Sequence, residues 1–212
     1  MAKQVHHRQQ YERHALDERT AGDDPIVLFH RWMDDAEADG LAEPHAMSLA
    51  TCGRQGPSCR IVLLRAFDPD GFVFYTNYNS HKALDLEHDP RAALLFFWQP
   101  LERQVRIEGS VERTSSGSSD AYFTSRPRGS RVGAWASDQS ARIKDREALD
   151  EKYQRWVERF PDEEIPRPMH WGGYRLRPAR IEFWQGRPDR MHDRVLFTRL
   201  PAGDWSRARL QP

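Results

Sequence analysis

Several short segments of the sequence combine cationic side chains with hydroxyl groups, a combination that suits binding of a phosphate group. Tyr122 and Arg126 are four residues apart and share one face of an expected helix. Pro127 disfavours helical geometry at Arg126, so a bend is expected there, and Ser130 lies where the next helix can start. A phenol, a guanidinium, a hydroxyl and free backbone amides around one bend predict a phosphate site, although Arg-Pro-Arg is also a common loop sequence.

A second cationic group lies earlier in the chain. Lys82 follows His81 at the start of an expected short helix, 81–88, where free backbone amides and the helix dipole favour an anion. Arg60 begins an apolar strand and Arg65 lies near its end. Because these two are five residues apart, they are expected to point to opposite faces, so that one of them could face a ligand. Ordinary solvated side chains fit the same pattern.

The densest cationic segment runs from Trp184 to Arg194 and also contains Arg190 and His192. A loop this cationic is costly to bury unless an anion or a carboxylate accompanies it. His192 has an ordinary pKa near neutrality and could position a proton or a phenolate-type oxygen. The alternative is a single histidine on the surface.

These segments lie on an expected series of strands and helices. Polar and apolar residues alternate from Glu102 to Arg113, which predicts a strand with one buried face. Asp24 before Pro25, followed by apolar residues at helical spacing, predicts a helix over about 25–39. The other expected strands are 46–52, 58–67, 72–76, 92–98, 173–176, 180–184, 195–199 and 205–210, and the other expected helices are 81–88, 115–125, 130–136 and 145–160. Antiparallel strands joined by hairpins predict a β-barrel with helical additions.

Length and composition narrow the class of protein. The 212 residues suit one domain, with residues 1–22 as a polar, mobile arm and 23–212 as the domain. Lys plus Arg equal Asp plus Glu at 32 each, so a general nucleic-acid binder, which usually carries a basic excess, is not expected. No apolar run approaches the length of a membrane span, and residues 1–13 lack an apolar signal region. The cytoplasm is therefore the expected compartment.

The two cysteines flank an expected hairpin turn. Cys52 and Cys59 lie on either side of Gly53-Arg54-Gln55-Gly56-Pro57. Without a secretion signal, two free thiols are expected rather than a cross-strand disulfide. With no further cysteine nearby, no metal site is expected there.

Long motifs in a fixed order connect the chain to a known family. They include Arg60-Ile61-Val62-Leu63-Leu64, Ser125-Arg126-Pro127-Arg128, Gly133-Ala134-Trp135, Trp171-Gly172-Gly173 and Arg190-Met191-His192-Asp193-Arg194. From about Arg8 to its end, the chain resembles pyridoxamine 5'-phosphate oxidase. The resemblance implies a mainly β fold with helices, the FMN-binding split β-barrel with peripheral α-helices, and a homodimer that binds flavin at the subunit interface. It also implies oxidation of pyridoxine 5'-phosphate or pyridoxamine 5'-phosphate to pyridoxal 5'-phosphate, with hydride passing to FMN and O2 reoxidising the flavin to give hydrogen peroxide.

The same resemblance implies a role for each matching residue. Arg60 and Lys82 would hold the flavin phosphate. Further flavin contacts would come from Ile61, Val62, Leu63, Leu64, Arg65, Tyr75, Thr76, His81, Gln104, Gln139, Ser140, Trp184 and Arg194. The substrate would be bound by Arg8, Tyr11, Arg65, Tyr122, Arg126, Ser130, Arg190 and His192, the last two being the catalytic pair against the pyridine ring. Two dianionic phosphates need two separate cationic sites, and the residues offer two.

Two positions depart from the family pattern. Arg65 stands where better-known members carry a lysine that touches the substrate phosphate, so the charge is kept while the reach and geometry change. His81 stands where an arginine is often found, so a neutral imidazole would weaken FMN binding at high pH.

Three other functions are compatible with parts of the sequence. A related split-barrel flavin oxidase acting on another substrate, such as one in phenazine formation, is disfavoured by the intact motifs around Arg126 and Arg190. A carrier that binds pyridoxal 5'-phosphate or FMN without turnover is the alternative from a different class. A structural interaction module is the most distant alternative.

Overall fold

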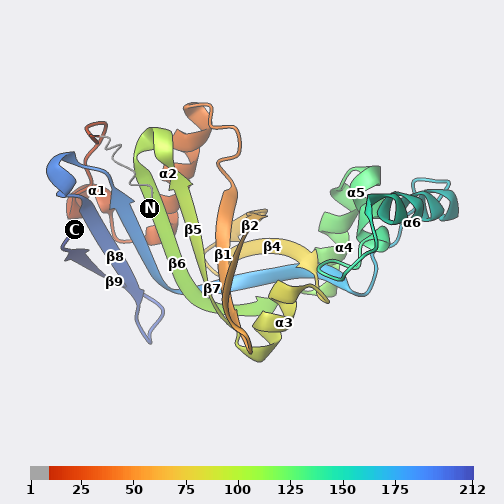
Figure 1. The fold of residues 1–212 in the computed structure, drawn as a ribbon. Coiled ribbons are helices and arrows are strands. Elements are labelled where there is room, and N and C mark those ends of the chain that lie inside the picture. The colour runs from red at the N-terminus through yellow and green to blue at the C-terminus, as the bar shows by residue number, and fades with distance from the viewer. Residues whose placement is uncertain (1–9) are drawn as a thin grey trace, which may run out of the picture. The chain divides into compact units, whose positions relative to one another are not determined.

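The structure is a computed structural model that describes residues 10–212, so Arg8 of the expected arm lies outside the described residues. Within this range the chain is mainly β, with helices between the strands (Figure 1). The strands are β1 (Ala46–Gly53), β2 (Gly56–Leu63), β3 (Ala66–Asp68), β4 (Gly71–Asn77), β5 (Arg91–Trp98), β6 (Arg103–Arg113), β7 (Trp171–Gln185), β8 (Asp193–Arg199) and β9 (Trp205–Leu210). The helices are α1 (Glu18–Ala21), α2 (Pro25–Ala38), α3 (His81–His88), α4 (Ser116–Ser125), α5 (Arg128–Ala136) and α6 (Arg146–Arg159), with short 3-10 turns η1 (Gln99–Leu101) and η2 (Pro188–Arg190).

Over residues 10–212 the strands form one sheet in the order β2-β1-β5-β6-β7-β4-β3, with β8 paired to β7 and β9 paired to β8. The pairs β3–β4, β4–β7, β7–β8 and β8–β9 are antiparallel: for example, Thr76 pairs with Gly172 in β4 and β7, and Trp184 pairs with Arg194 in β7 and β8. No helix in the described range combines the length and apolar character that a membrane crossing needs.

Three expected strands form differently from the prediction. Separate strands were expected at 173–176 and 180–184, but β7 is continuous from 171 to 185 because Pro178 keeps an extended backbone instead of making a turn. The expected strand 58–67 is instead two strands, β2 and β3, with a break at 64–65.

The described chain divides into two compact units, which we call unit 1 (up to residue 47, 94–108 and 178–212) and unit 2 (48–93 and 109–177). Strands β1, β5, β6 and β7 each contribute residues to both. The expectation of one domain over 23–212 stays a prediction.

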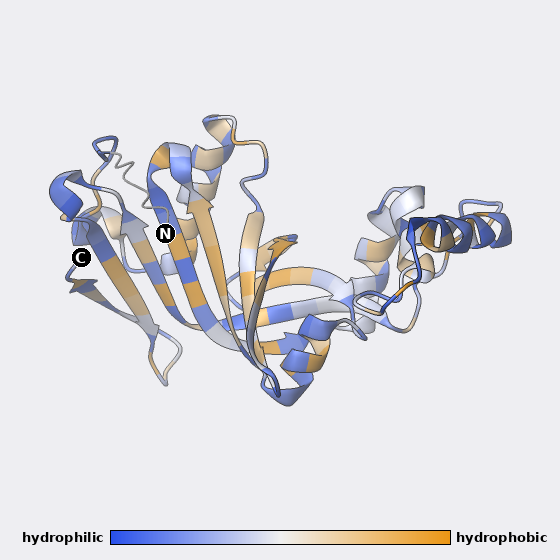
Figure 2. Ribbon diagram, viewed as in Figure 1, coloured by the Kyte–Doolittle hydropathy of each residue, from blue (hydrophilic) through white to orange (hydrophobic). Residues whose placement is uncertain are grey.

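Unit 1 has an aromatic core under helix α2. The side chain of Asp24 accepts a hydrogen bond from the backbone N–H of Ile26, and Pro25 occupies the first helical position, which begins the helix as predicted. The buried face of α2 meets the sheet through rings: Phe29 packs 5.1 Å from Phe96, and Trp32 packs 5.1 Å from Phe183. Figure 2 shows apolar and polar residues alternating along β6, as expected for a strand with one buried face.

Unit 2 joins a ladder of β3, β4 and β7 to helices α4, α5 and α6. Its helical core contains Phe123, Val132, Ile165 and Trp171, against which partly buried rings of α6 also pack. At the β3–β4 hairpin, Gly71 has φ 137°, and a Cβ there would lie 2.1 Å from the carbonyl oxygen of Leu176. This position therefore requires glycine. The core holds the end of α4 and the start of α5 around the bend at Pro127.

Candidate functional site

Unit 2 contains a cavity of about 800 Å³. Its walls come from β2, β4, the start of α3, the end of α4, α5 and residues 137–140. The cavity brings together most of the residues that the sequence analysis singled out in this unit: Arg60, Ile61, Val62, Leu63, Arg65, Tyr75, Thr76, His81, Lys82, Tyr122, Arg126, Ser130, Gln139 and Ser140. Leu64 does not line it and is buried instead.

Arg60 and Arg65 line the same cavity, contrary to the expectation that they face apart. The alternation of a strand would separate them only if the strand ran through both residues. Strand β2 ends at Leu63, and Arg65 lies in the break before β3. Its side chain therefore does not follow the alternation of faces along β2.

Lys82 is a buried cation whose hydrogen bonds go to neutral groups. The residue is only 8% exposed. Its Nζ donates hydrogen bonds to Thr76 Oγ1 at 3.2 Å, Ser80 Oγ at 3.3 Å and Gln139 Oε1 at 3.1 Å. Burial, with a smaller contribution from the charge of Arg60, lowers the pKa of Lys82 to about 8. Within residues 10–212 no carboxylate pairs with this ammonium group. An anion in the cavity would therefore stabilise its charged form.

Arg126 is a second cation of the cavity, and the residue is half-buried. Its guanidinium carbon lies 4.6 Å from the ring centroid of Trp171, and Nη1 is buried with no hydrogen-bond partner in the described part of the chain. Burial lowers the pKa of Arg126; the nearby Tyr122 opposes this, and the charge of Arg65 adds to it. An unpartnered, buried guanidinium nitrogen is rare and calls for an acceptor from outside the chain.

Three parallel aromatic rings lie beside Arg126. Tyr75 stacks on Tyr122 at 3.9 Å and on Trp171 at 5.5 Å, with interplanar angles of 17° and 9°. Ser130 stands in the first turn of α5, directly after the bend. The phenol, guanidinium and hydroxyl that the sequence predicted around one bend thus line one cavity.

The sequence analysis gave no individual role to several lining residues. These are Ser58, Cys59, Asn77, Gly133, Ala134, Ser137 and Trp171. Gly133, Ala134 and Trp171 belong to motifs that carried the family resemblance, which was the available signal for them. Both cysteines are free thiols, as expected.

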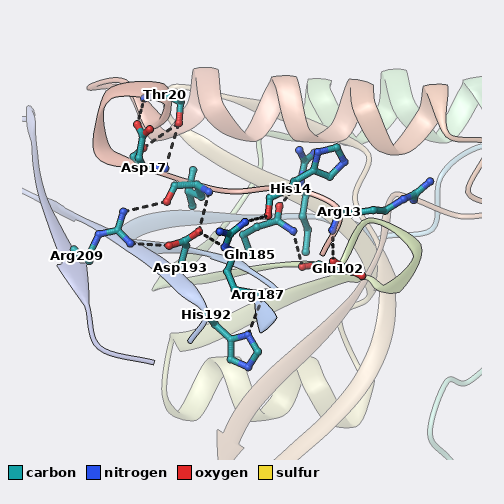
Figure 3. A network of polar contacts seen from close by, with 12 residues as sticks. Arg13, His14, Asp17, Thr20, Glu102, Gln185, Arg187, His192, Asp193 and Arg209 are labelled. Atoms are coloured by element: carbon teal, nitrogen blue, oxygen red, sulfur yellow. Dashed lines mark hydrogen bonds and ion pairs between the residues drawn. The ribbon is translucent and has the colours of Figure 1, made fainter. Parts of the chain in front are cut away.

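Unit 1 contains a separate aromatic cluster around His192. Its ring lies 4.6 Å from Trp184 and 5.9 Å from Tyr11, which meets Trp184 edge-on at 5.8 Å. The backbone N–H of Arg187 donates to His192 Nδ1 at 3.1 Å, a contact visible in Figure 3. Burial lowers the pKa of His192; the charge of Arg190 adds to this and Asp193 opposes it. Because Nδ1 accepts a hydrogen bond, the neutral ring carries its proton on Nε2 and presents a donor there.

The loop before β8 is tied down at Asp193. This carboxylate accepts from the backbone N–H of Leu16 at 3.0 Å and from Arg209 Nη1 at 2.8 Å, and lies 3.5 Å from Arg187 Nε (Figure 3). Arg190 is exposed and has a left-handed backbone with φ 64°, next to Asp189 with φ 54°. Two consecutive residues in this region are strained, and such strain is a feature of functional loops.

Arg194 and Gln104 also belong to unit 1. Arg194 Nε donates to Glu182 Oε1 at 2.8 Å, and Nη1 donates to the carbonyl of Gln211 at 2.9 Å. Glu182 is only 3% exposed and also accepts from Arg106 Nη2 at 2.6 Å. Gln104 is partly buried on the more polar face of β6.

Comparison with known proteins gives consistent matches along the chain. The family model described as pyridoxamine 5'-phosphate oxidase matches residues 33–160, and that described as pyridoxine 5'-phosphate oxidase C-terminal dimerisation region matches 171–212. A pyridoxine/pyridoxamine 5'-phosphate oxidase of Cupriavidus necator is 54% identical over 206 residues, 97% of each chain. One of Burkholderia cenocepacia is 56% identical over 205 residues, 95% of each chain.

Solved structures extend this likeness to the fold. PhzG from Burkholderia lata 383, in complex with tetrahydrophenazine-1-carboxylic acid, has a TM-score of 0.84 and 31% identity over 90% of this chain and 94% of that one. A pyridoxamine 5'-phosphate oxidase-related, FMN binding protein from Nostoc punctiforme has a TM-score of 0.72 at 21% identity, covering 89% of this chain and 98% of that one, a likeness of fold. The expected fold class, a mainly β split barrel with peripheral helices, is confirmed.

Proposed function

The chain belongs to the pyridoxamine 5'-phosphate oxidase family and is an oxidoreductase, and from this premise we propose that it oxidises pyridoxine or pyridoxamine 5'-phosphate to pyridoxal 5'-phosphate with FMN. The observation that supports the proposal best is the cavity of unit 2, where the buried Lys82 and the half-buried Arg126 have no carboxylate partner in the described range. A cofactor and a substrate that each carry a phosphate would supply the two missing anions.

The residues of the cavity fit a flavin phosphate near Lys82. Lys82 and Arg60 provide two cationic donors, and the dipole at the N-terminus of α3, where Lys82 stands, favours an anion. Thr76, Gln139 and Ser140 offer polar groups for the rest of the cofactor. When bound, FMN supplies the hydride acceptor, and its reoxidation by O2 gives hydrogen peroxide.

The substrate phosphate is assigned to the group around the bend at Pro127. Arg126 would donate through Nη1, which has no acceptor among residues 10–212, and Tyr122 and Ser130 would donate hydroxyl protons. Arg65, which also lines the cavity, would add a second positive charge. Binding the phosphate firmly holds the reacting carbon in one place, which is the main contribution the protein makes to a hydride transfer.

His192 and Arg190 are proposed to bind the pyridine ring. With its proton on Nε2, His192 would donate a hydrogen bond to an oxygen substituent of the ring, and the exposed guanidinium of Arg190 would neutralise negative charge on it. Flavin contacts from Gln104, Trp184 and Arg194, and substrate contacts from Tyr11 and Arg8, stay predictions from the family resemblance.

We also propose that the enzyme is a homodimer that acts in the cytoplasm. The match of residues 171–212 to a C-terminal dimerisation region supports the dimer. Two exposed free thiols, Cys52 and Cys59, are compatible with a reducing compartment. No nucleic-acid or membrane partner is proposed.

The likeness to PhzG supports a second candidate, oxidation of a phenazine precursor. The ligand named with that structure is a carboxylic acid with no phosphate. A cavity for such a ligand would not need a separate phosphate site around Arg126, so we favour the phosphorylated vitamin.

Oxygen uptake and peroxide release test the proposal. Protein reconstituted with FMN is given pyridoxine 5'-phosphate, pyridoxamine 5'-phosphate or, as a control, unphosphorylated pyridoxine. Steady peroxide release with the phosphorylated substrates is expected. Tight binding without peroxide would identify a carrier, and turnover of a phenazine precursor alone would identify the second candidate.

A further inference from the structure

A buried carboxylate stands beside the proposed flavin-phosphate site, although its charge has the wrong sign to bind a phosphate. Asp85 lies on the second turn of α3 and is 4% exposed. Its Oδ2 lies 3.6 Å from Arg60 Nη2, and its Oδ1 lies 3.5 Å from His81 Nε2. None of the roles assigned above uses this residue.

Asp85 also reaches the guanidinium of Arg60 through two hydroxyl groups. Thr51 Oγ1 and Ser58 Oγ donate to Asp85 Oδ2 at 2.7 and 2.8 Å. The same two oxygens accept from Arg60, Thr51 from Nη1 at 2.7 Å and Ser58 from Nη2 at 2.5 Å. A hydroxyl has a single proton, so donating it to Asp85 leaves the oxygen lone pairs directed at Arg60.

The lack of a side chain at Gly53 leaves room for the Asp85 carboxylate. A Cβ at Gly53 would lie 2.0 Å from Asp85 Oδ1, so only glycine allows β1 to pass this close. Burial by itself would raise the pKa of Asp85, but the hydrogen bonds from Thr51 and Ser58 and the charges of His81 and Arg60 bring that pKa below its ordinary value. The carboxylate is therefore ionised at neutral pH and can act as the acceptor for both hydroxyls.

We propose that Asp85 is a positioning residue for the flavin phosphate: it orients Thr51 and Ser58, and these hold the Arg60 guanidinium toward the cavity. The inference rests on the proposed function, because the anion that Arg60 would bind is the FMN phosphate. Thr51 does not line the cavity, and in the described range its hydroxyl contacts Asp85, Arg60 and Ser58, so an effect of Thr51 on the cofactor acts through these residues.

Two simpler roles predict different results. If Asp85 acted only through its charge, its removal would strengthen FMN binding, because a negative charge near a dianion is repulsive. If Asp85 only supported the fold, its removal would weaken binding of every flavin alike. Positioning of Arg60 predicts weaker binding of the phosphorylated flavin alone.

The experiment measures the Kd of the apoprotein for FMN and for riboflavin, which lacks the phosphate, by quenching of flavin fluorescence. In Asp85→Asn the Kd for FMN is expected to rise about 10- to 100-fold, the range for hydrogen bonds to a charged group. In Thr51→Val, which changes no charge, it is expected to rise about 3- to 10-fold. The Kd for riboflavin is expected to change by less than about twofold in both variants.

Asp89→Asn is the matched control. Asp89 caps the same helix and pairs with Arg91 in an exposed ion pair, so the variant makes the same charge change without touching Arg60. An unchanged or lower Kd for FMN in Asp85→Asn, or an equal loss of riboflavin binding, would overturn the inference. If Asp85→Asn does not fold, an unchanged FMN Kd in Thr51→Val overturns it. Failure of the wild-type protein to bind FMN would overturn the proposed function instead.

Discussion

Lys82 and Arg126 in the cavity of unit 2 differ from the arginines of strands β8 and β9 in unit 1, because in the described part of the chain only the latter are paired with carboxylates. In the cavity, Lys82 donates only to neutral oxygens, and Arg126 Nη1 has no partner in the described range. In unit 1, Arg194 is paired with the buried Glu182 and Arg209 with Asp193. A charge held away from water without a partner is costly, which supports the proposal that the first arrangement binds external anions. The second arrangement uses its charges to hold the loop that carries His192.

Charged residues near a functional site can contribute to stability or to ligand binding, and the two units differ in which contribution is expected. In unit 1, breaking an ion pair such as Glu182 with Arg194 should mainly reduce stability, because both charges of the pair already have a partner. In unit 2, removing Arg126 should cost binding but not stability. The predictions below test this difference in order of expected effect.

Arg126→Met is expected to have the largest effect on catalysis. Loss of the charged donors to the substrate phosphate should lower kcat/KM by a factor on the order of 100 to 1000. The Tm should stay the same or rise, because a half-buried cation with one buried, unpartnered nitrogen is replaced by an apolar side chain. Steady-state kinetics and calorimetry measure both. A clearly lowered Tm would break the comparison between the units.

Glu182→Ala is expected to give the opposite result in unit 1. The change leaves Arg106 and Arg194 without their shared carboxylate and should lower the free energy of unfolding by about 2–3 kcal/mol. Chemical denaturation measures this. Glu112→Ala, which breaks an exposed pair with Arg177, is the control and should cost under about 1 kcal/mol. Equal losses in the two variants would contradict the prediction.

The titration of Lys82 is expected to lower the FMN affinity of the apoprotein and to raise its free energy of unfolding as pH increases. FMN affinity should fall as pH rises through about 8, where the ammonium loses its proton. In the unfolded chain the pKa of this lysine is near its ordinary 10.5, so between about pH 8 and pH 10.5 the unfolded state binds more protons than the folded state. The free energy of unfolding should therefore rise with pH over this range. Fluorescence titration and denaturation across this range measure the two trends. In Lys82→Met both should flatten, and a persistent affinity profile would exclude Lys82 as its cause.

Arg65→Lys is expected to have the smallest effect. By the family resemblance, the substitution introduces the lysine of better-known members, and it keeps the positive charge, so kcat/KM should change by no more than about fivefold. Arg65→Met, which removes the charge, should cost several times more. If the lysine variant matched Arg65→Met in its loss, the guanidinium geometry rather than the charge would be the important feature at this position.

Several parts of this fold followed from local patterns. Asp24 and Pro25 predicted where α2 begins, and the alternation after Glu102 predicted the buried face of β6. The α3 helix has the expected bounds, 81–88. These features depend on neighbours within a few residues, which is why periodicity and capping residues reveal them. The break between β2 and β3 and the continuity of β7 depend on pairing with distant strands, and both were predicted wrongly.

The residues alone determined that cations and hydroxyls would meet around Pro127 and at the start of α3, because helical spacing and helix ends are local properties. Only the folded chain decided which of those cations stay without a carboxylate and which, like Arg60 with Asp85, are held by one. That choice depends on side chains brought together from far apart, such as Thr51 and Asp85, which are 34 positions apart. Charged groups lose their hydration only when folding buries them together, so the pattern of neighbouring residues in the sequence could not predict which cations would be paired.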